Sequence, residues 1–185
     1  MAYIFDPHKL QTLASKHVGL PHKEMCAAII DDLAKEYPGH IETRQQWILS
    51  ICGGAMGIMT ILHGSLSEYL LIFGTPIGTE GYSGRYRVDI YDVIIAGEMW
   101  TYTEESYSER IVTRPGEMGH LRRRQVKGFK FPEGAWMLEY GRGPIPTTLP
   151  FALSGAVTSL AFRPILETLW IYGRLVIKEL CRGKI

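Results

Sequence analysis

The chain has 185 residues, 46% of them hydrophobic, with 20 lysines and arginines against 19 aspartates and glutamates. This composition excludes a disordered protein, and a net charge of +1 argues against a dedicated nucleic-acid binder, so no nucleic-acid partner is expected. We expect a single domain over residues 1–185, because a chain of this length buries enough surface to fold without disulfides or a structural metal.

Cysteine and histidine patterns give no sign of a metal centre or a disulfide framework. The three cysteines, Cys26, Cys52 and Cys181, have no CxxC spacing, and the six histidines form no HxH or HExxH motif. The N-terminus has neither the basic flank and apolar core of a signal peptide nor an 18-residue apolar anchor. The sequence therefore predicts no metal, no signal peptide and no N-terminal transmembrane anchor.

Two helices are expected within residues 1–40. The first begins at Asp6-Pro7, a suitable helix start, and its apolar residues recur at helical spacing until a glycine ends it. The second begins at Pro21 and ends at a Pro-Gly pair. Both are short and amphipathic.

The segment from Gln45 to Ser67 has no charged residue and by length alone is compatible with a membrane span. Its internal glycines favour buried β-strands instead. Residues 74–84, with four glycines and a proline, are expected to form turns. Strands at the observed spacing indicate a barrel or sandwich over residues 45–143. They are expected at Trp47–Cys52, Ile58–His63, Glu68–Phe73, Arg85–Ala96, Glu98–Thr103, Glu109–Thr113, Arg124–Phe129 and Trp136–Tyr140.

The C-terminal part is again apolar. Residues 144–162 carry no charge, and residues 165–180 are expected to form a mostly apolar helix whose charges include Glu167, Arg174 and Lys178. Such a helix is too short and too charged to span a bilayer comfortably. Two alternatives remain: it lies in a bilayer interface with its apolar side down, or it packs on the barrel or on a neighbouring subunit.

Glu139 is the strongest candidate for acid–base chemistry. In a strand it shares its face with Met137, whereas Leu138 and Tyr140 face the other way. If its face lines a barrel interior, burial raises the pKa of the carboxyl, which then holds a proton near neutral pH. The alternative is that Glu139 faces solvent or pairs with Arg142.

Asp89 and Asp92 lie in another predicted strand. Their odd separation places them on opposite faces, so only one should point inward unless a bulge intervenes. Two carboxyls that share a site split their pKa values, which leaves one protonated and one ionised.

Two weaker signals favour structural roles. Glu68 lies among apolar residues, where a hydrogen-bonded structural role is favoured over catalysis. The basic run at residues 120–124, with Lys127 and Lys130 nearby, is typical of a solvated face, although it also suits anionic lipid head groups.

Several motifs, in the same order, resemble one known family. They are residues 62–75 (LHGSLSEYLLIFGT), 78–84 (GTEGYSG) and 136–146 (WMLEYGRGPIP) followed by 149–153 (LPFAL). These closely resemble the family of the fungal C-8 sterol isomerase and the sigma non-opioid receptor, and the likeness runs from about Tyr3 to Leu180.

The resemblance implies a mainly β, α+β fold: a cupin-like β-barrel with two N-terminal helices and two C-terminal helices, over residues 147–182, that rest against a membrane. It also implies a homotrimer. The expected location is peripheral, on the cytoplasmic face of a membrane or on the endoplasmic reticulum, with attachment through the C-terminal helices.

Ligands in that family enter a closed apolar interior, where a glutamate binds a cationic amine. By resemblance this glutamate is Glu139, its hydrogen-bonding aspartate is Asp92, Tyr69 lies near the amine, and Phe131 takes the place of a pocket tryptophan. The other expected ligand-binding residues are Met59, Ile61, Leu71, Phe73, Ile90, Thr148, Leu149 and Ala152.

The motifs draw on both branches of the family. Ala55, the turn at 78–81 and residues 115–121 agree with the isomerase, whereas Asp92 follows the receptor and an acid at Asp89 suits both. The first hypothesis is a cofactor-independent isomerase that moves a sterol double bond from Δ8 to Δ7 through a carbocation, with Glu139 and Asp89 or Asp92 as acid and base. The alternatives are a non-catalytic binder of cationic amphiphiles or sterols, and a membrane-surface scaffold.

Overall fold

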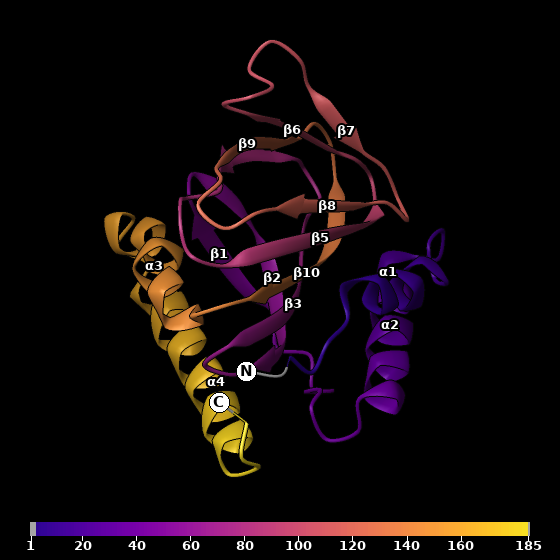
Figure 1. Ribbon diagram of the computed structural model, residues 1–185, viewed down its shortest axis with the longest axis vertical. Coiled ribbons are helices and arrows are strands. Elements are labelled where there is room, and N and C mark those ends of the chain that lie inside the picture. The colour runs from indigo at the N-terminus through magenta and orange to yellow at the C-terminus, as the bar shows by residue number, and fades with distance from the viewer. Residues whose placement is uncertain (1–2, 185) are drawn as a thin grey trace.

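The computed structural model describes residues 3–184, so residues 1, 2 and 185 of the expected domain lie outside the described residues. Within that range ten strands form two sheets, with α1 and α2 on one side and α3 and α4 on the other (Figure 1). The expected class, mainly β with flanking helices, is confirmed.

The larger sheet has six strands, and each of its neighbouring pairs is antiparallel. Its central strands are β3 and β10, so both are hydrogen-bonded on two sides. In spatial order the strands are β1 (Ile48–Cys52), β2 (Ala55–Gly64), β3 (Glu68–Thr75), β10 (Ala135–Arg142), β5 (Asp89–Ala96) and β8 (Met118–Leu121).

The charge-free segment 45–67 forms the β1–β2 hairpin. Cys52 pairs with Ala55 across a two-residue turn, in which Gly53 and Gly54 have φ values of +58° and +90°. Positive φ at both positions suits glycine and matches the twist of a tight hairpin. The strand interpretation is thus confirmed, and between residues 3 and 184 we find no helix with the length and apolarity needed to cross a membrane.

The smaller sheet has the order β4 (Thr79–Tyr82), β9 (Lys127–Phe131), β6 (Met99–Thr103) and β7 (Ile111–Thr113). The prediction of turns throughout residues 74–84 is wrong for β4, because that segment pairs with β9. Strand β8, which pairs with β5, was also not expected. In both cases pairing with a distant strand overrides a glycine-containing local sequence.

The prediction of a closed barrel is wrong in one respect. The strands between residues 3 and 184 divide into two hydrogen-bonded sheets and do not form one continuous closed ladder. Side chains from both sheets nevertheless face a common cavity.

Helices α1 (Pro7–Ser15) and α2 (His22–Glu36) cover the outer face of the larger sheet. The Asp6 carboxylate accepts a hydrogen bond from the Lys9 backbone N–H at 2.8 Å, which caps the first helix. The apolar faces of both helices form one core with the sheet. Its members include Leu10, Met25, Ile29, Ile30, Leu33, Leu62, Leu70, Ile72, Tyr91, Val93, Leu138 and Tyr140.

Alternation along the central strands separates this core from the cavity. On β10, Leu138 and Tyr140 belong to the helix-facing core, whereas Met137 and Glu139 line the cavity. This is the arrangement that the two-residue period of a strand predicts. The sheet therefore has one wholly structural face and one face available for chemistry.

After the last strand, a 3-10 turn η1 (Ile145–Thr148) leads into α3 (Leu149–Thr158) and α4 (Phe162–Leu180). Helix α3 packs closely on β1, because a Cβ added to Gly155 would lie only 2.5 Å from the Ile51 carbonyl oxygen. In α4, Ile171 and Leu175 are buried in a cluster with Ile48 and Ile61.

The alternative in which the C-terminal helix packs on the β-structure is therefore confirmed for one face of α4. The opposite face carries large apolar side chains in contact with solvent, and Trp170 is 73% exposed. Other exposed apolar residues of α3, α4 and their connection are Val157, Leu160, Phe162, Leu166 and Ile177.

Candidate active site

A cavity of about 200 Å³ lies between the two sheets and is completed by η1, α3 and α4. Its wall is mostly aliphatic and aromatic, with Asp92, Lys127 and Glu139 as its charged members among the described residues. Of the residues expected to form the site, the following line it: Met59, Ile61, Tyr69, Leu71, Phe73, Ile90, Asp92, Glu139, Thr148, Leu149 and Ala152.

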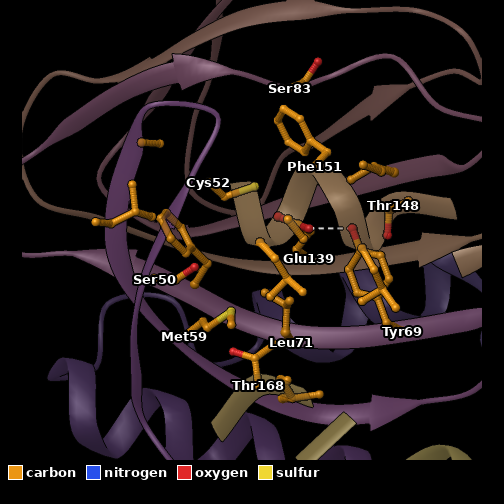
Figure 2. Close-up of a pocket in the computed structure, with 18 of the residues that line it drawn as sticks. Ser50, Cys52, Met59, Tyr69, Leu71, Ser83, Glu139, Thr148, Phe151 and Thr168 are labelled. Atoms are coloured by element: carbon orange, nitrogen blue, oxygen red, sulfur yellow. Dashed lines mark hydrogen bonds between the residues drawn. The ribbon is translucent and has the colours of Figure 1, made fainter. Parts of the chain in front are cut away.

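Glu139 projects into this cavity from the middle of β10. Its Oε1 accepts a hydrogen bond of 2.6 Å from the Tyr69 hydroxyl on the neighbouring strand β3, and the two side chains point toward each other (Figure 2). The alternative pairing with Arg142 does not occur, since Arg142 donates to the Tyr91 hydroxyl at 2.7 Å. The carboxyl therefore faces the apolar interior.

The surroundings of Glu139 raise its pKa to about 7. Burial makes the largest contribution, because it removes water from the charged form, and the negative charge of Asp92 adds to it. The Tyr69 hydrogen bond and the positive charge of Lys127 act in the opposite direction. As a result, a large fraction of Glu139 carries a proton at neutral pH.

Asp92 lies directly opposite Glu139 in the pairing of β5 with β10. It is 2% exposed and forms an ion pair with Lys127, whose side chain reaches in from β9 of the smaller sheet. The two carboxyls of this site thus differ in surroundings, since Asp92 has a cationic partner and Glu139 a neutral hydroxyl donor.

Tyr69, Tyr86 and Cys52 add neutral polar groups to the wall. Burial raises the pKa of all three groups, and the nearby negative charge of Glu139 adds to this effect. The pKa of Tyr69 lies well above its usual value, that of Tyr86 is also raised, and that of Cys52 is about 12. All three groups remain protonated at neutral pH. Glu139 is therefore the group in this set that titrates near pH 7.

Asp89 and Phe131 do not line the cavity. Asp89 lies on the other face of β5, where its carboxylate accepts hydrogen bonds from the Arg123 backbone N–H and Nε. This placement follows from the odd separation between Asp89 and Asp92, and it separates Asp89 from Glu139. Phe131 is buried behind the wall, with its ring centroid 6.2 Å from that of Phe73.

Sequence reasoning missed Lys127 as a site residue, because it was grouped with a basic run typical of a solvated face. The alternation of side chains along β9 could have indicated this role. Lys127 lies on the same face of the strand as Phe129 and Phe131, whereas the exposed Lys130 lies on the other face. Phe151, whose ring lies 5.6 Å from that of Tyr86, was also not singled out. Its place in the cavity depends on how α3 folds back over the sheets.

Two other polar clusters lie outside the cavity. The expected structural role of Glu68 is confirmed: it is fully buried and accepts hydrogen bonds from the Ile4 backbone N–H at 2.8 Å and the Tyr140 hydroxyl at 2.7 Å. The Lys184 ammonium lies 2.8 Å from the same carboxylate. This carboxylate therefore connects both ends of the chain to the sheet.

The second cluster brings His40 and His63 together with Glu179. The His40 Nδ1 lies 2.8 Å from the Glu179 carboxylate, and the His63 ring bonds to the His40 carbonyl oxygen at 2.8 Å. The potential metal-ligand atoms of the three residues lie within 4.8 Å of one another. Their contacts join the end of α4 to the loop after α2.

The geometry of the cavity suits proton transfer to and from an apolar molecule. It combines a carboxyl that is partly protonated at neutral pH with a second carboxyl on the adjacent strand, inside a wall that is otherwise mainly hydrocarbon. Paired acids with different surroundings are typical of acid–base catalysis.

The chain is similar to two groups of curated proteins. The family model described as "ERG2 and Sigma1 receptor like protein" matches residues 1–184. C-8 sterol isomerase ERG2 of Gibberella zeae is 41% identical over 99% of this chain and 79% of its own length. Sigma non-opioid intracellular receptor 1 of Gallus gallus is 39% identical over 96% of this chain and 81% of its own length.

Solved structures with more distant likeness are also found. An RmlC-like cupin from Shewanella frigidimarina aligns with a TM-score of 0.45 and 18% identity, over 55% of this chain and 85% of that one. A predicted oxalate decarboxylase from Thermotoga maritima aligns with a TM-score of 0.45 and 12% identity, over 53% of this chain and 90% of that one.

Proposed function

The chain belongs to the family of ERG2 and Sigma1 receptor like proteins, and from this premise we propose that it is a sterol isomerase that moves a ring double bond from C8–C9 to C7–C8. The observation that carries the proposal is the Glu139 carboxyl, which lies opposite Asp92 in an apolar cavity and has a pKa of about 7. Relatives named C-8 sterol isomerase, at 41% and 39% identity, support it.

In the proposed reaction, Glu139 is the acid. Its protonated carboxyl donates a proton to C9, and the π electrons of the C8–C9 bond form the new C9–H bond, which leaves a carbocation at C8. The carboxylate formed at Glu139 retains the Tyr69 hydrogen bond and lies close enough to stabilise the positive charge. A group with a pKa near the working pH suits this role, because it is both protonated and able to release its proton.

Asp92 is the proposed base. It removes a proton from C7, and the electrons of that C–H bond form the C7–C8 double bond. One proton is gained and one lost, so the reaction is balanced without a redox cofactor or a metal. Because Asp92 and Glu139 oppose each other on paired strands, the proton can pass back to Glu139 and restore the starting state.

The wall of the cavity would protect the intermediate. Aliphatic and aromatic side chains exclude water that would otherwise trap a carbocation. The aromatic faces of Phe73, Tyr86 and Phe129 are part of this wall, and a cation–π contact contributes roughly 0.5 to 2 kcal/mol.

The cavity volume of about 200 Å³ is below the roughly 300 to 1,000 Å³ of most ligand pockets. We therefore expect η1 and α3, which close one side of the cavity, to move outward when a sterol enters. The exposed apolar residues of α3 and α4 lie on the same part of the molecule, and we propose that they rest on a membrane from which the sterol arrives.

The test is to incubate the purified protein with a Δ8-sterol in D₂O and to analyse the product by mass spectrometry and NMR. We expect a Δ7-sterol that carries solvent deuterium at C9, and no turnover by Glu139→Gln. The exposed Glu133→Gln variant is the control and should match the wild type. A folded wild-type protein that forms no Δ7 product contradicts the proposal.

The second candidate is a binding protein for cationic amphiphiles or sterols without catalysis. The specific observation in its favour is that two carboxyls face the same apolar cavity, which suits an ammonium group. Glu139→Gln should then abolish amine binding while the protein stays folded. A homotrimer remains a prediction from the family resemblance, and light scattering coupled to gel filtration would test it.

A further inference from the structure

The cluster of His40, His63 and Glu179 lies outside the cavity, where the end of α4 meets the loop after α2 and the end of β2. His63 on β2 is 1% exposed and Glu179 in the last turn of α4 is 2% exposed, whereas His40 in the loop is only partly buried. Up to 139 positions separate these residues in the sequence, so histidine spacing alone gives no sign of the cluster.

One ring nitrogen of His63 is buried without a partner. Its Nδ1 lies 2.8 Å from the His40 carbonyl oxygen, and because a carbonyl oxygen only accepts, Nδ1 carries the hydrogen and donates it. Burial lowers the pKa of the ring and so favours its neutral form, in which Nε2 holds a lone pair. Within residues 3–184 this Nε2 has no hydrogen-bond partner. A buried acceptor without a donor costs free energy and calls for an explanation.

The bond to the carbonyl gives His63 the surroundings of a metal-ligating histidine. Such a histidine binds the metal through one ring nitrogen and usually donates the N–H of the other to a backbone carbonyl or a carboxylate, which fixes its tautomer and orientation. Glu179 has an outer partner as well. Its Oε1 lies 3.5 Å from the Arg182 guanidinium, while its Oε2 faces the His40 Nδ1 at 2.8 Å.

The distances within the cluster are close to those that a tetrahedral ion requires. Zinc binds histidine nitrogen and carboxylate oxygen at about 2.0 to 2.2 Å, which places two ligand atoms of a tetrahedral site roughly 3.3 Å apart. One ring nitrogen of each histidine and one Glu179 oxygen lie within 4.8 Å of one another. Side-chain shifts of roughly 1 Å would bring these atoms to the required spacing.

We propose that His40, His63 and Glu179 form a zinc site that joins the C-terminal end of α4 to the rest of the protein. Two histidines and a glutamate are a known set of zinc ligands, and water would complete the coordination on the exposed side of His40. The same set is poorly suited to Mg²⁺ or Ca²⁺, which prefer oxygen ligands. Because Thr168 and Tyr172 of α4 line the cavity, the ion would also stabilise one wall of it.

The first experiment measures zinc binding by the metal-free protein in competition with a chromophoric chelator. We expect one zinc ion per chain in the wild type. In His40→Gln and in Glu179→Gln the affinity should fall on the order of a hundredfold or more, since loss of an outer partner alone costs about 10- to 100-fold. An excess of Mg²⁺ should not displace the zinc.

His17→Gln is the matched control. The His17 ring forms a similar pair with Asp32 at 3.0 Å, but among the described residues this pair does not belong to a group of three potential ligands. Its replacement should therefore leave the zinc affinity unchanged. If the buried Glu179→Gln does not fold, His40→Gln still provides the test, because the His40 side chain is 30% exposed.

Two further readouts distinguish a built site from scattered surface binding. Cobalt(II) in place of zinc should give the intense visible absorption of a four- or five-coordinate site in the wild type and in His17→Gln, but not in His40→Gln. Zinc at a hundredfold excess over its dissociation constant should raise the melting temperature of the wild type by about 5 to 10 °C. The melting temperature of His40→Gln should not change.

A wild type that binds no zinc overturns the inference. So does zinc that binds equally well to the wild type and to folded His40→Gln, because the ion is then held by other groups. These readouts do not involve sterol turnover. Failure of the zinc site and failure of the proposed isomerase activity are therefore seen separately.

Discussion

The Tyr69 hydroxyl donates a hydrogen bond of 2.6 Å to Glu139 from the adjacent strand, and this bond favours the ionised carboxylate. It therefore acts against the burial that raises the pKa of Glu139. The hydroxyl is a positioning group whose removal should be visible in a pH profile.

For Tyr69→Phe we predict that the pKa of Glu139 rises by about one to two units, since a hydrogen bond to a charged group contributes roughly 1.5 to 3 kcal/mol. The falling limb of kcat/KM against pH should move to higher pH by the same amount. Tyr102→Phe, at an exposed tyrosine of β6, is the control. A lower rate with an unmoved limb would mean that Tyr69 only shapes the cavity.

For the wild type we predict that isomerisation is fastest below pH 7 and falls as the pH rises through about 7, because Glu139 loses the proton that it must donate. Three neutral groups of the cavity wall do not explain such a limb, because burial raises the pKa of Cys52 to about 12 and raises those of Tyr69 and Tyr86. Rates that increase through pH 7 would exclude Glu139 as the acid.

The protonation of Glu139 should also change the free energy of unfolding with pH. The pKa of Glu139 is about 7 in the folded protein and 4.5 without the fold's influence, so the folded state holds the proton more tightly. This contribution is fully present below about pH 4.5 and is lost as the pH rises through 7. Urea unfolding of the wild type and of Glu139→Gln across this pH range should show that the free energy of unfolding decreases less in the variant. If the free energies of both proteins change with pH in parallel, Glu139 makes no such contribution.

Replacing Glu68 should destabilise the fold without acting on the cavity. Glu68→Ala leaves the Ile4 and Phe5 backbone donors without their acceptor and removes one partner of the Lys184 ammonium, whereas the Tyr140 hydroxyl keeps the Phe5 carbonyl oxygen at 3.2 Å. We expect the free energy of unfolding to fall by about 3 to 5 kcal/mol in urea titrations. Glu80→Ala, at a side chain 72% exposed, should change it by less than about 0.5 kcal/mol. A loss below about 1 kcal/mol for Glu68→Ala would argue against this role.

Filling the cavity should stop turnover while the fold persists. Ala152 on α3 lines the cavity, and in Ala152→Trp an indole would take up much of the available 200 Å³. We expect kcat/KM to fall by about a hundredfold or more with a melting temperature close to that of the wild type. Val157→Trp, on the exposed side of the same helix, is the control. Undiminished turnover in a folded Ala152→Trp would place the reaction elsewhere.

Local patterns predicted which face of its strand each acid occupies, whereas Tyr69 was assigned to the site by the family resemblance. The two-residue period of a strand placed Glu139 with Met137 and apart from Leu138, and it separated Asp89 from Asp92. Glycine breaks likewise distinguished the β1–β2 hairpin from a membrane span. These inferences succeeded because each depends only on residues close together in the chain.

Features that depend on distant partners were missed. Strand β4 forms because β9 pairs with it, although its own sequence is typical of turns. Lys127 resembled a surface residue because its partner lies 35 positions earlier in the chain. The division into two sheets is likewise a property of strand pairing, which single-strand periodicity does not specify.

The position of β10 between two hydrogen-bonded neighbours has a consequence for how this chain can vary. Deleting or inserting a single residue between Ala135 and Glu139 would exchange the two faces of the strand, so that Leu138 or Tyr140 would enter the cavity and the carboxyl would be buried against α1 and α2. Both neighbouring strands would have to pair differently to absorb the change, and the pairing of β10 with β5 already shifts its register once, between Trp136 and Met137. A substitution in this segment therefore changes one side chain on one face, whereas a change in its length exchanges the acid and the core residues together.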